Sequence, residues 1–245
     1  MLVPKTSDII HKAWLYRVLS GVADNTFLVS LLRFKGGTCA AMRGIIDRFS
    51  VDLDFDMLTA KTGQIEKINT HLETIFNDLG LEIKDRSKRV PQFFLRYKNA
   101  PGERSILRFD VTSSATSTNE YEPYRFIEID RIIYCQTIPT MFSNKLVAAI
   151  ERYEKYKSIA GRDIFDIHTF FSRGYTYLPQ IIMERRNMKI KKFFEQLYGF
   201  IQKKVTQNIL DEDLNHLMEK TNFHRIRKFL KQEVLMFIMA EIKRL

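Results

Sequence analysis

The chain has 245 residues, of which 45% are hydrophobic and 28% charged, as is typical of a globular protein with one large domain or two modest ones. Its longest apolar run, residues 234–240, is too short to span a bilayer, and its start shows no secretory signal pattern. The two cysteines and five histidines show no metal-binding spacing. We therefore expect a protein of the reducing cytoplasm, without a membrane partner.

The net charge of +10 is unevenly distributed. Residues 1–138 hold 19 basic and 17 acidic residues, whereas residues 139–245 hold 20 and 12, so the second half carries +8. A basic surface attracts polyanions, with RNA or DNA first among them, although basic surfaces also serve solubility alone.

The first 138 residues mix helical and strand patterns. Residues 7–21 have helical spacing with Ser7 or Asp8 as a cap, and residues 49–56 alternate strictly, as a strand does. The other expected elements are a short apolar element over 27–34, a helical turn from Thr38, a helix over 59–80, and strands over 81–87, 92–99, 105–114 and 124–135.

From Pro139 onward only helical periodicity remains. The expected helices cover residues 140–156, 162–174, 178–205 and 224–245. The sequence thus predicts a mixed α/β domain over 1–138, followed by an all-helical basic domain over 139–245.

The segment 34–57, FKGGTCAAMRGIIDRFSVDLDFDM, begins with a glycine turn. Gly36 and Gly37 let the backbone approach a ligand closely, because no Cβ stands in the way. Thr38 lies at an expected helix start, where free N–H groups and the helix dipole favour an anion such as a phosphate. The alternative is an ordinary turn without a ligand.

The same segment ends with aspartates at alternate positions of a strand. Asp52 and Asp54 share one face, with their Cα atoms about 6.6 Å apart, and can hold a divalent cation together with nucleotide phosphates. Asp110 joins them if its strand is adjacent. Two unit charges about 4 Å apart repel by about 4 kcal/mol at an effective dielectric of about 20. Either one of the three carboxylates is therefore protonated, or a cation is bound, for which Mg²⁺ is the natural candidate, or the three do not converge. The alternative is a solvated strand face, and Asp56 is expected to be solvated or structural.

Together these residues resemble the signature of the nucleotidyltransferase superfamily, and more closely that of the AbiEii/AbiGii family of bacterial nucleotidyltransferase toxins. The matching stretches are KGGT at residues 35–38 and R-x-S-x-DLDF at residues 48–55. The resemblance implies an α+β fold: a nucleotidyltransferase-like mixed sheet with flanking helices, followed by an all-helical second domain.

Family members also carry a lysine early in the helical half and an R-D-x-x-D segment further along, which Lys145 and residues 162–166 match. The resemblance implies that Lys145 neutralises triphosphate charge and that Asp163 orients Lys145 or the acceptor hydroxyl. From the residues alone, Lys145 can equally extend its ammonium to solvent from an apolar helix face, and Asp163 can be a helix N-cap. A cleft between the two halves would let both motif sets face one nucleotide.

A basic run beside two phenylalanines lies in the second half. On a helix it is either a solvated face or a surface that contacts RNA phosphates. The candidate RNA-binding residues are Arg185, Arg186, Lys189, Lys191 and Lys192.

The favoured hypothesis is a Mg²⁺-dependent nucleotidyltransferase that moves NMP from an NTP to an acceptor hydroxyl. The expected residues are Asp52, Asp54, Lys145 and Asp163 for catalysis, Lys35, Gly36, Gly37, Thr38 and Lys145 for the nucleotide, and Asp52, Asp54 and Asp110 for the metal. The resemblance implies an RNA acceptor, tRNA foremost, and a toxin restrained by a cognate antitoxin. The alternatives are a non-catalytic RNA- or nucleotide-binding protein that retains the fold, and transfer to a small molecule or a protein side chain.

Overall fold

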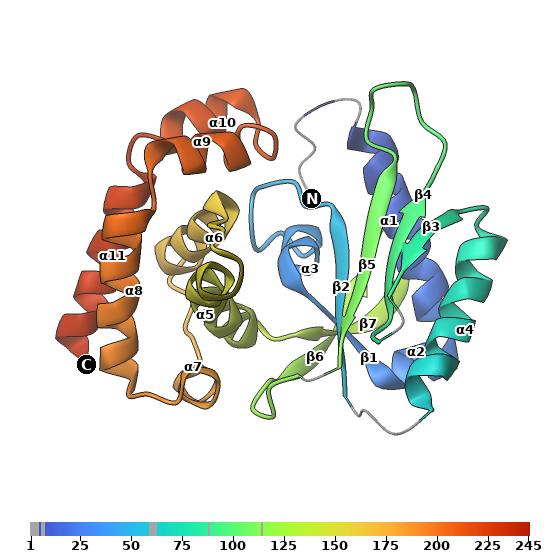
Figure 1. Cartoon of the computed structure of the whole chain (residues 1–245), viewed down its shortest axis with the longest axis horizontal. Helices are drawn as coiled ribbons and strands as arrows, with labels where there is room; N and C mark the ends of the chain where they lie inside the picture. The colour runs from blue at the N-terminus through green and yellow to red at the C-terminus, as the bar shows by residue number, and fades with distance from the viewer. Residues whose placement is uncertain (1–4, 6–7, 59–62, 88, 114) are drawn as a thin grey trace. The chain divides into compact units, whose positions relative to one another are not determined.

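The chain forms two compact units, which the computed structural model describes over residues 5, 8–58, 63–87, 89–113 and 115–245 (Figure 1). We call them the sheet unit and the helical unit. The sheet unit comprises Met1–Gly44, Phe49–Ala115 and Tyr121–Gln136, and the helical unit comprises Ile45–Arg48, Thr116–Glu120 and Thr137–Leu245. The predicted cap Ser7, the first four residues of the helix expected from residue 59, and residue 114 lie outside the described residues.

The described part of the sheet unit is built on a seven-stranded mixed sheet of order β3-β4-β5-β2-β1-β7-β6. β2 pairs parallel to β5 and β1 parallel to β7, while all other neighbours are antiparallel. The predicted mixed sheet is therefore confirmed. The strands are β1 (Leu32–Lys35), β2 (Asp52–Met57), β3 (Glu82–Arg86), β4 (Gln92–Arg96), β5 (Ile106–Thr112), β6 (Tyr121–Phe126) and β7 (Arg131–Gln136).

An aromatic core covers one face of this sheet. Phe55 of β2 lies 5.2 Å from Phe34 and 5.0 Å from Phe109, ring centroid to ring centroid, and Phe76 packs onto Phe109 from a helix. Because strand side chains alternate, burying Phe55 and Leu53 leaves the β2 aspartates on the opposite face. The helices of this unit are α1 (Asp8–Asp24), α2 (Thr26–Leu31), α3 (Gly36–Met42) and α4 (Gln64–Asp78).

The helical unit has its own aromatic core. Phe142 stacks on Phe170 with ring centroids 4.9 Å apart, and Phe193 and Phe194 are fully buried. Its helices are α5 (Ile138–Tyr156), α6 (Gly161–Ser172), α7 (Pro179–Arg186), α8 (Ile190–Lys204), α9 (Gln207–Leu214), α10 (Lys220–Ile226) and α11 (Leu230–Arg244).

The structure corrects three expected elements. The strand expected over 124–135 is a hairpin of β6 and β7, turning through Asp130 at φ 53°. The helix expected over 178–205 breaks at Asn187, which takes φ 47°, a left-handed conformation that Asn and Asp tolerate better than most residues. The helix expected over 224–245 is two helices, α10 and α11, and α9 was not expected.

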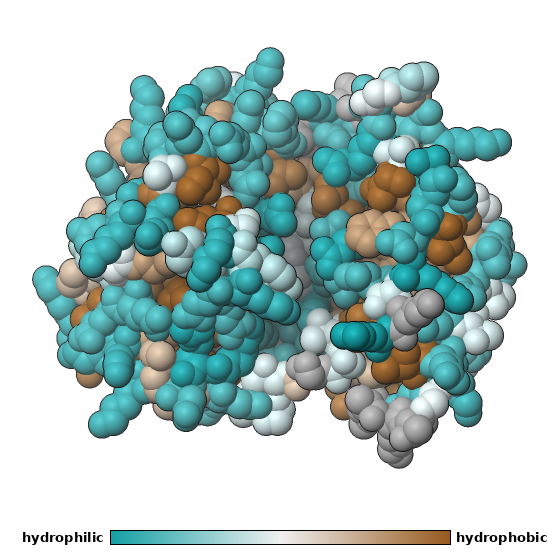
Figure 2. Space-filling model, in the orientation of Figure 1, coloured by the Kyte–Doolittle hydropathy of each residue, from teal (hydrophilic) through white to brown (hydrophobic). Residues whose placement is uncertain are grey.

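Hydrophilic side chains cover most of the molecular face shown in Figure 2. Within the described part of the chain, no helix has both the length and the apolar character that crossing a bilayer requires.

Candidate active site

The glycine turn and the aspartates of β2 meet in the sheet unit. Lys35, the last residue of β1, lies opposite Asp54 in the antiparallel register, and Gly36 follows at φ +77°. A Cβ built on Gly36 would come within 2.7 Å of the Asp54 Oδ2 atom. Position 36 therefore requires glycine for two reasons: its backbone is left-handed, and a carboxylate lies where a Cβ would stand.

The negative charge of the Asp54 carboxylate is disfavoured by its surroundings. Burial raises its pKa to about 6, with the charges of Asp52 and Asp110 adding to the effect and those of Lys35 and Arg108 opposing it. No hydrogen bond or ion pair joins its side chain to another described residue. A cation placed beside Asp52 and Asp54 would relieve this repulsion.

The parallel pairing of β2 with β5 places Asp110 directly beside Asp54, as the register Asp54↔Asp110 shows. However, Arg108 and Gln92 both donate to the Asp110 Oδ2 atom. Within the described ranges, no three His, Cys, Asp or Glu side chains are grouped to hold a metal ion. The condition for Asp110, an adjacent strand, is therefore met, but its carboxylate is paired with Arg108, and its place in the metal site stays a prediction.

Of the two expectations for Asp56, solvated or structural, the structure shows the second. It is 1% exposed, and its Oδ1 atom accepts a hydrogen bond of 2.6 Å from the Lys35 ammonium. Lys35 also donates to the Thr112 hydroxyl at 2.7 Å. The Oδ2 atom of Asp56 accepts from Gln136 and Tyr121. The alternation of β2 contained the signal, since Asp56 shares a face with Lys35, but burial of a third acid is not evident from a sequence.

Thr38 does not present its hydroxyl to a ligand. The side chain is fully buried, and its hydroxyl donates to the Asp52 carbonyl oxygen and lies 2.9 Å from the Ser50 Oγ atom. Thr38 therefore ties the start of α3 to the start of β2, and its expected phosphate contact stays a prediction.

The second predicted group lies within the helical unit. The Lys145 ammonium of α5 binds Asp163 at 2.9 Å and Asp166 at 3.0 Å, and only 18% of its side chain is exposed. Burial opposes its charge, but the two carboxylates outweigh burial and raise the pKa of Lys145. The expected alternative, an ammonium extended to solvent, is not what the structure shows.

Asp163 is not a helix cap, because α6 is capped by Ala160 without a side-chain hydrogen bond. Burial disfavours its charge, yet Lys145 and Arg152 together hold the pKa of Asp163 at about 2. Arg152 contacts its Oδ2 atom at 3.2 Å. Asp163 therefore stays ionised and keeps the Lys145 ammonium in place.

Arg48 and Asp166 complete this group and were not assigned roles from the sequence. The Arg48 guanidinium donates to both oxygens of Asp166, at 2.6 Å and 2.7 Å, and both side chains are at most 2% exposed. The spacing of Asp163 and Asp166, three residues apart on one helix, was the available signal for a shared face. The partner Arg48 is 118 residues away in sequence, which no local pattern reveals.

The basic run does not form one helical face. Arg185, in the last turn of α7, pairs with Glu151 and Asn144, and Arg186 pairs through two contacts with Glu154. Lys189, Lys191 and Lys192 are exposed, on the far side of the break at Asn187. Only these three lysines of the five predicted RNA-binding residues are therefore clearly presented to solvent.

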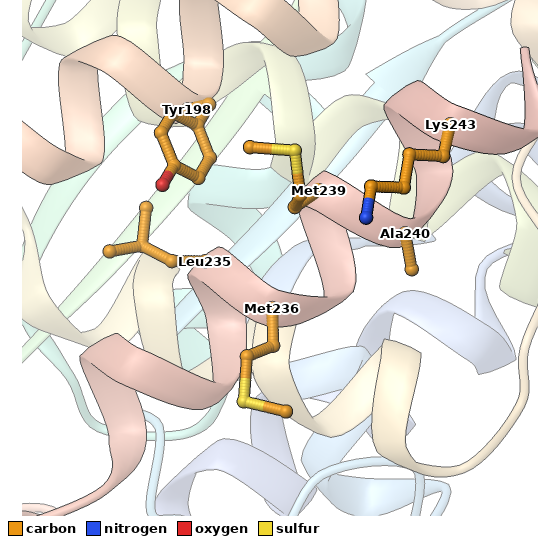
Figure 3. Close-up of a pocket in the computed structure, with 6 residues that line it drawn as sticks. All are labelled: Tyr198, Leu235, Met236, Met239, Ala240 and Lys243. Carbon is orange, nitrogen blue, oxygen red and sulfur yellow. The ribbon is translucent and has the colours of Figure 1, made fainter.

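A pocket of about 380 Å³ lies between α8 and α11 (Figure 3). Its lining is apolar apart from the Tyr198 hydroxyl and the Lys243 ammonium, and it contains no carboxylate. It offers no metal ligands and none of the predicted site residues.

A mixed sheet with a glycine turn against paired aspartates, joined to a helical unit, defines a nucleotidyltransferase-like protein. The chain belongs to the AbiEii family, nucleotidyl transferase toxins of type IV toxin–antitoxin systems, whose family model matches residues 17–234. It is accordingly an NTP-dependent nucleotidyltransferase of a family that implies a cognate antitoxin. No curated protein matches the chain in sequence.

Solved structures share the fold. A candidate nucleotidyltransferase from H. pylori superposes with a TM-score of 0.61 at 17% identity, covering 98% of this chain and 96% of that one. The JHP933 structure from Helicobacter pylori superposes with a TM-score of 0.54 at 17% identity, again covering 98% of this chain and 96% of that one. MenT4, a nucleotidyltransferase toxin from Mycobacterium tuberculosis H37Rv, superposes with a TM-score of 0.53 at 13% identity, covering 97% of this chain and 87% of that one. At these identities the likeness establishes the fold.

Proposed function

We propose that the chain uses Mg²⁺ and an NTP to transfer NMP to a hydroxyl of RNA, with tRNA the foremost acceptor. The observation that carries the proposal is the position of Asp52 and Asp54 on one strand face, with Asp54 held against the glycine turn at Gly36.

The residues present fit a divalent metal. Asp54 is a partly buried carboxylate without a hydrogen-bond or ion-pair partner among the described residues, and the missing Cβ of Gly36 lets it lie against the glycine turn. Asp52 and Asp54 would hold the ion, with nucleotide phosphates as further ligands. Asp110 can join them only if Arg108 releases it. When bound, Mg²⁺ would activate the acceptor hydroxyl and neutralise the leaving pyrophosphate.

The chain's own groups would bind and neutralise the nucleotide. Lys35 and the backbone of Gly36 and Gly37 are the proposed phosphate contacts, because they lie at the turn beside the carboxylates. Lys145, kept protonated by Asp163, is proposed to stabilise negative charge that develops during transfer.

RNA as the acceptor is supported by charge. The second half of the chain carries +8, and Lys189, Lys191 and Lys192 are exposed. We propose that the reaction takes place in the cytoplasm, where NTP and RNA are both abundant, and that the antitoxin of the system counteracts it there.

A labelling experiment tests this function. The full chain is incubated with each labelled NTP, Mg²⁺ and total RNA, and the label is followed into RNA, protein and small molecules. We expect labelled RNA, and loss of at least about a thousandfold of the rate in Asp52→Ala/Asp54→Ala, because transition-state charge stabilisation is the largest catalytic contribution.

The matched control is Asp78→Ala/Asp85→Ala, which removes two exposed carboxylates of the same unit. Persistent RNA labelling by the Asp52→Ala/Asp54→Ala protein would refute the mechanism. NTP binding without any transfer would favour the non-catalytic alternative, and label in protein or small molecules would reassign the acceptor.

A further inference from the structure

Two carboxylates of β2 compete for one lysine. Lys35 lies opposite Asp54 in the strand register, yet its ammonium binds Asp56 at 2.6 Å and Thr112 at 2.7 Å. Asp54, its cross-strand neighbour, has no ion pair with any described residue. The surroundings of Asp56 must therefore make it a better partner than Asp54 for the Lys35 ammonium.

Asp56 is anchored from two further strands. Its Oδ2 atom accepts a hydrogen bond of 2.6 Å from the Gln136 side chain of β7 and one of 3.0 Å from the Tyr121 hydroxyl of β6. Asp56 and Gln136 are 1% and 3% exposed. With both carboxylate oxygens engaged and water excluded, Asp56 is a rigid and strongly attractive partner for a cation.

We propose that Asp56 is a positioning residue that holds the Lys35 ammonium away from Asp54, and so keeps Asp54 available to a divalent cation. Without this hold, Lys35, which lies directly opposite Asp54 in the β1–β2 register, could form a salt bridge with it. An internal salt bridge at Asp54 would then have to break before the carboxylate could bind a metal ion.

The same arrangement keeps the Lys35 ammonium near Asp54 without pairing the two. Lys35 remains next to the carboxylates, where its charge can meet nucleotide phosphates, but it is not a permanent counter-ion of Asp54. Asp56 thus allows Lys35 to contact phosphates and Asp54 to bind a metal ion at the same place, the end of β1. The inference rests on the proposed function only in taking a divalent cation as the ligand of Asp52 and Asp54.

Direct Mn²⁺ binding to the full-length protein tests the inference, read by electron paramagnetic resonance with and without a non-hydrolysable NTP analogue. In Asp56→Asn we expect Mn²⁺ affinity to fall about tenfold, the usual scale for residues that orient a metal site from behind its ligands. Adding Lys35→Met to that variant should restore the affinity, because the competing ammonium is then gone. A merely structural role of Asp56 would not be rescued in this way.

Asp78→Asn is the charge-matched control and should leave Mn²⁺ binding unchanged. Thr112→Val covers the case in which Asp56→Asn fails to fold, because it loosens Lys35 without altering charge and should weaken Mn²⁺ binding in the same direction. Unchanged affinity in every folded variant, or a loss that Lys35→Met does not reverse, would overturn the inference. A wild-type chain that binds Mn²⁺ and responds as expected but transfers no NMP would refute the proposed function alone.

Discussion

Gly36 determines how closely the chain can approach the Asp54 carboxylate. Its backbone is left-handed, and any β-carbon there would overlap the Asp54 Oδ2 atom. Glycines at other turns share only the first property. Gly44 takes φ +71°, but a Cβ on it would meet no atom within 4 Å. The two positions therefore separate backbone strain from displacement of the carboxylate.

We predict that Gly36→Ala and Gly44→Ala each lower the free energy of unfolding by about 1–2 kcal/mol, the cost of a left-handed non-glycine residue. Only Gly36→Ala should also abolish NMP transfer and weaken Mn²⁺ binding, because only it moves Asp54. Thermal melts and the labelling assay report the two effects separately. Equal activity in both variants would show that Asp54 adjusts without consequence.

At the scale of elements, α6 is the centre of the charge network in the helical unit. Asp163 and Asp166 lie one turn apart on it, and between them they bind Lys145, Arg152 and Arg48. Buried charges are tolerated only when they are paired, so each partner protects the others from an isolated charge in the core.

The depressed pKa of Asp163 predicts a pH-dependent contribution to stability. Because the folded value of about 2 lies below the ordinary 3.8, the contribution is complete above about pH 4 and is lost as the pH falls through about 2. Urea unfolding of the wild type and Asp163→Asn should therefore differ by about 1 kcal/mol less at pH 3 than at pH 6. A difference that does not change with pH would contradict this account.

Sequence patterns predicted helices, strands and turns better than strand pairing and side-chain contacts. The alternation of β2 and the GGT turn placed Asp52, Asp54 and Gly36 correctly, because strand period and glycine conformation are local properties. The pairing of β2 with β5, which places Asp110 beside Asp54, depends on strand order, and the capture of Asp110 by Arg108 and Gln92 depends on side-chain packing. Neither leaves a local trace in the sequence.

At the scale of the whole molecule, the net charge of +10 is concentrated in the second half of the chain. Part of that charge is already used internally, since Arg185 and Arg186 pair with glutamates of α5. The exposed lysines near the start of α8 are not engaged in this way and remain the better candidates for RNA contact.

We predict that Lys191→Glu/Lys192→Glu weakens RNA binding by about tenfold or more at low salt and flattens the dependence of affinity on salt, because phosphate contacts release counter-ions. Lys67→Glu/Lys98→Glu changes the net charge equally within the sheet unit and should weaken binding less. Fluorescence anisotropy with labelled RNA between about 50 and 200 mM salt measures both. Equal weakening would mean that overall charge, rather than this lysine cluster, governs RNA binding.

The connectivity of the two units limits how this protein can be divided. The polypeptide passes between them five times, after Gly44, Arg48, Ala115, Glu120 and Gln136. A fragment truncated after Gln136 would keep Arg48 but lose Asp166, leaving a guanidinium that is 2% exposed in the intact chain without its carboxylate. A cut after Gln136 therefore does not separate the two units, because residues 45–48 and 116–120 of the helical unit stay with the first fragment.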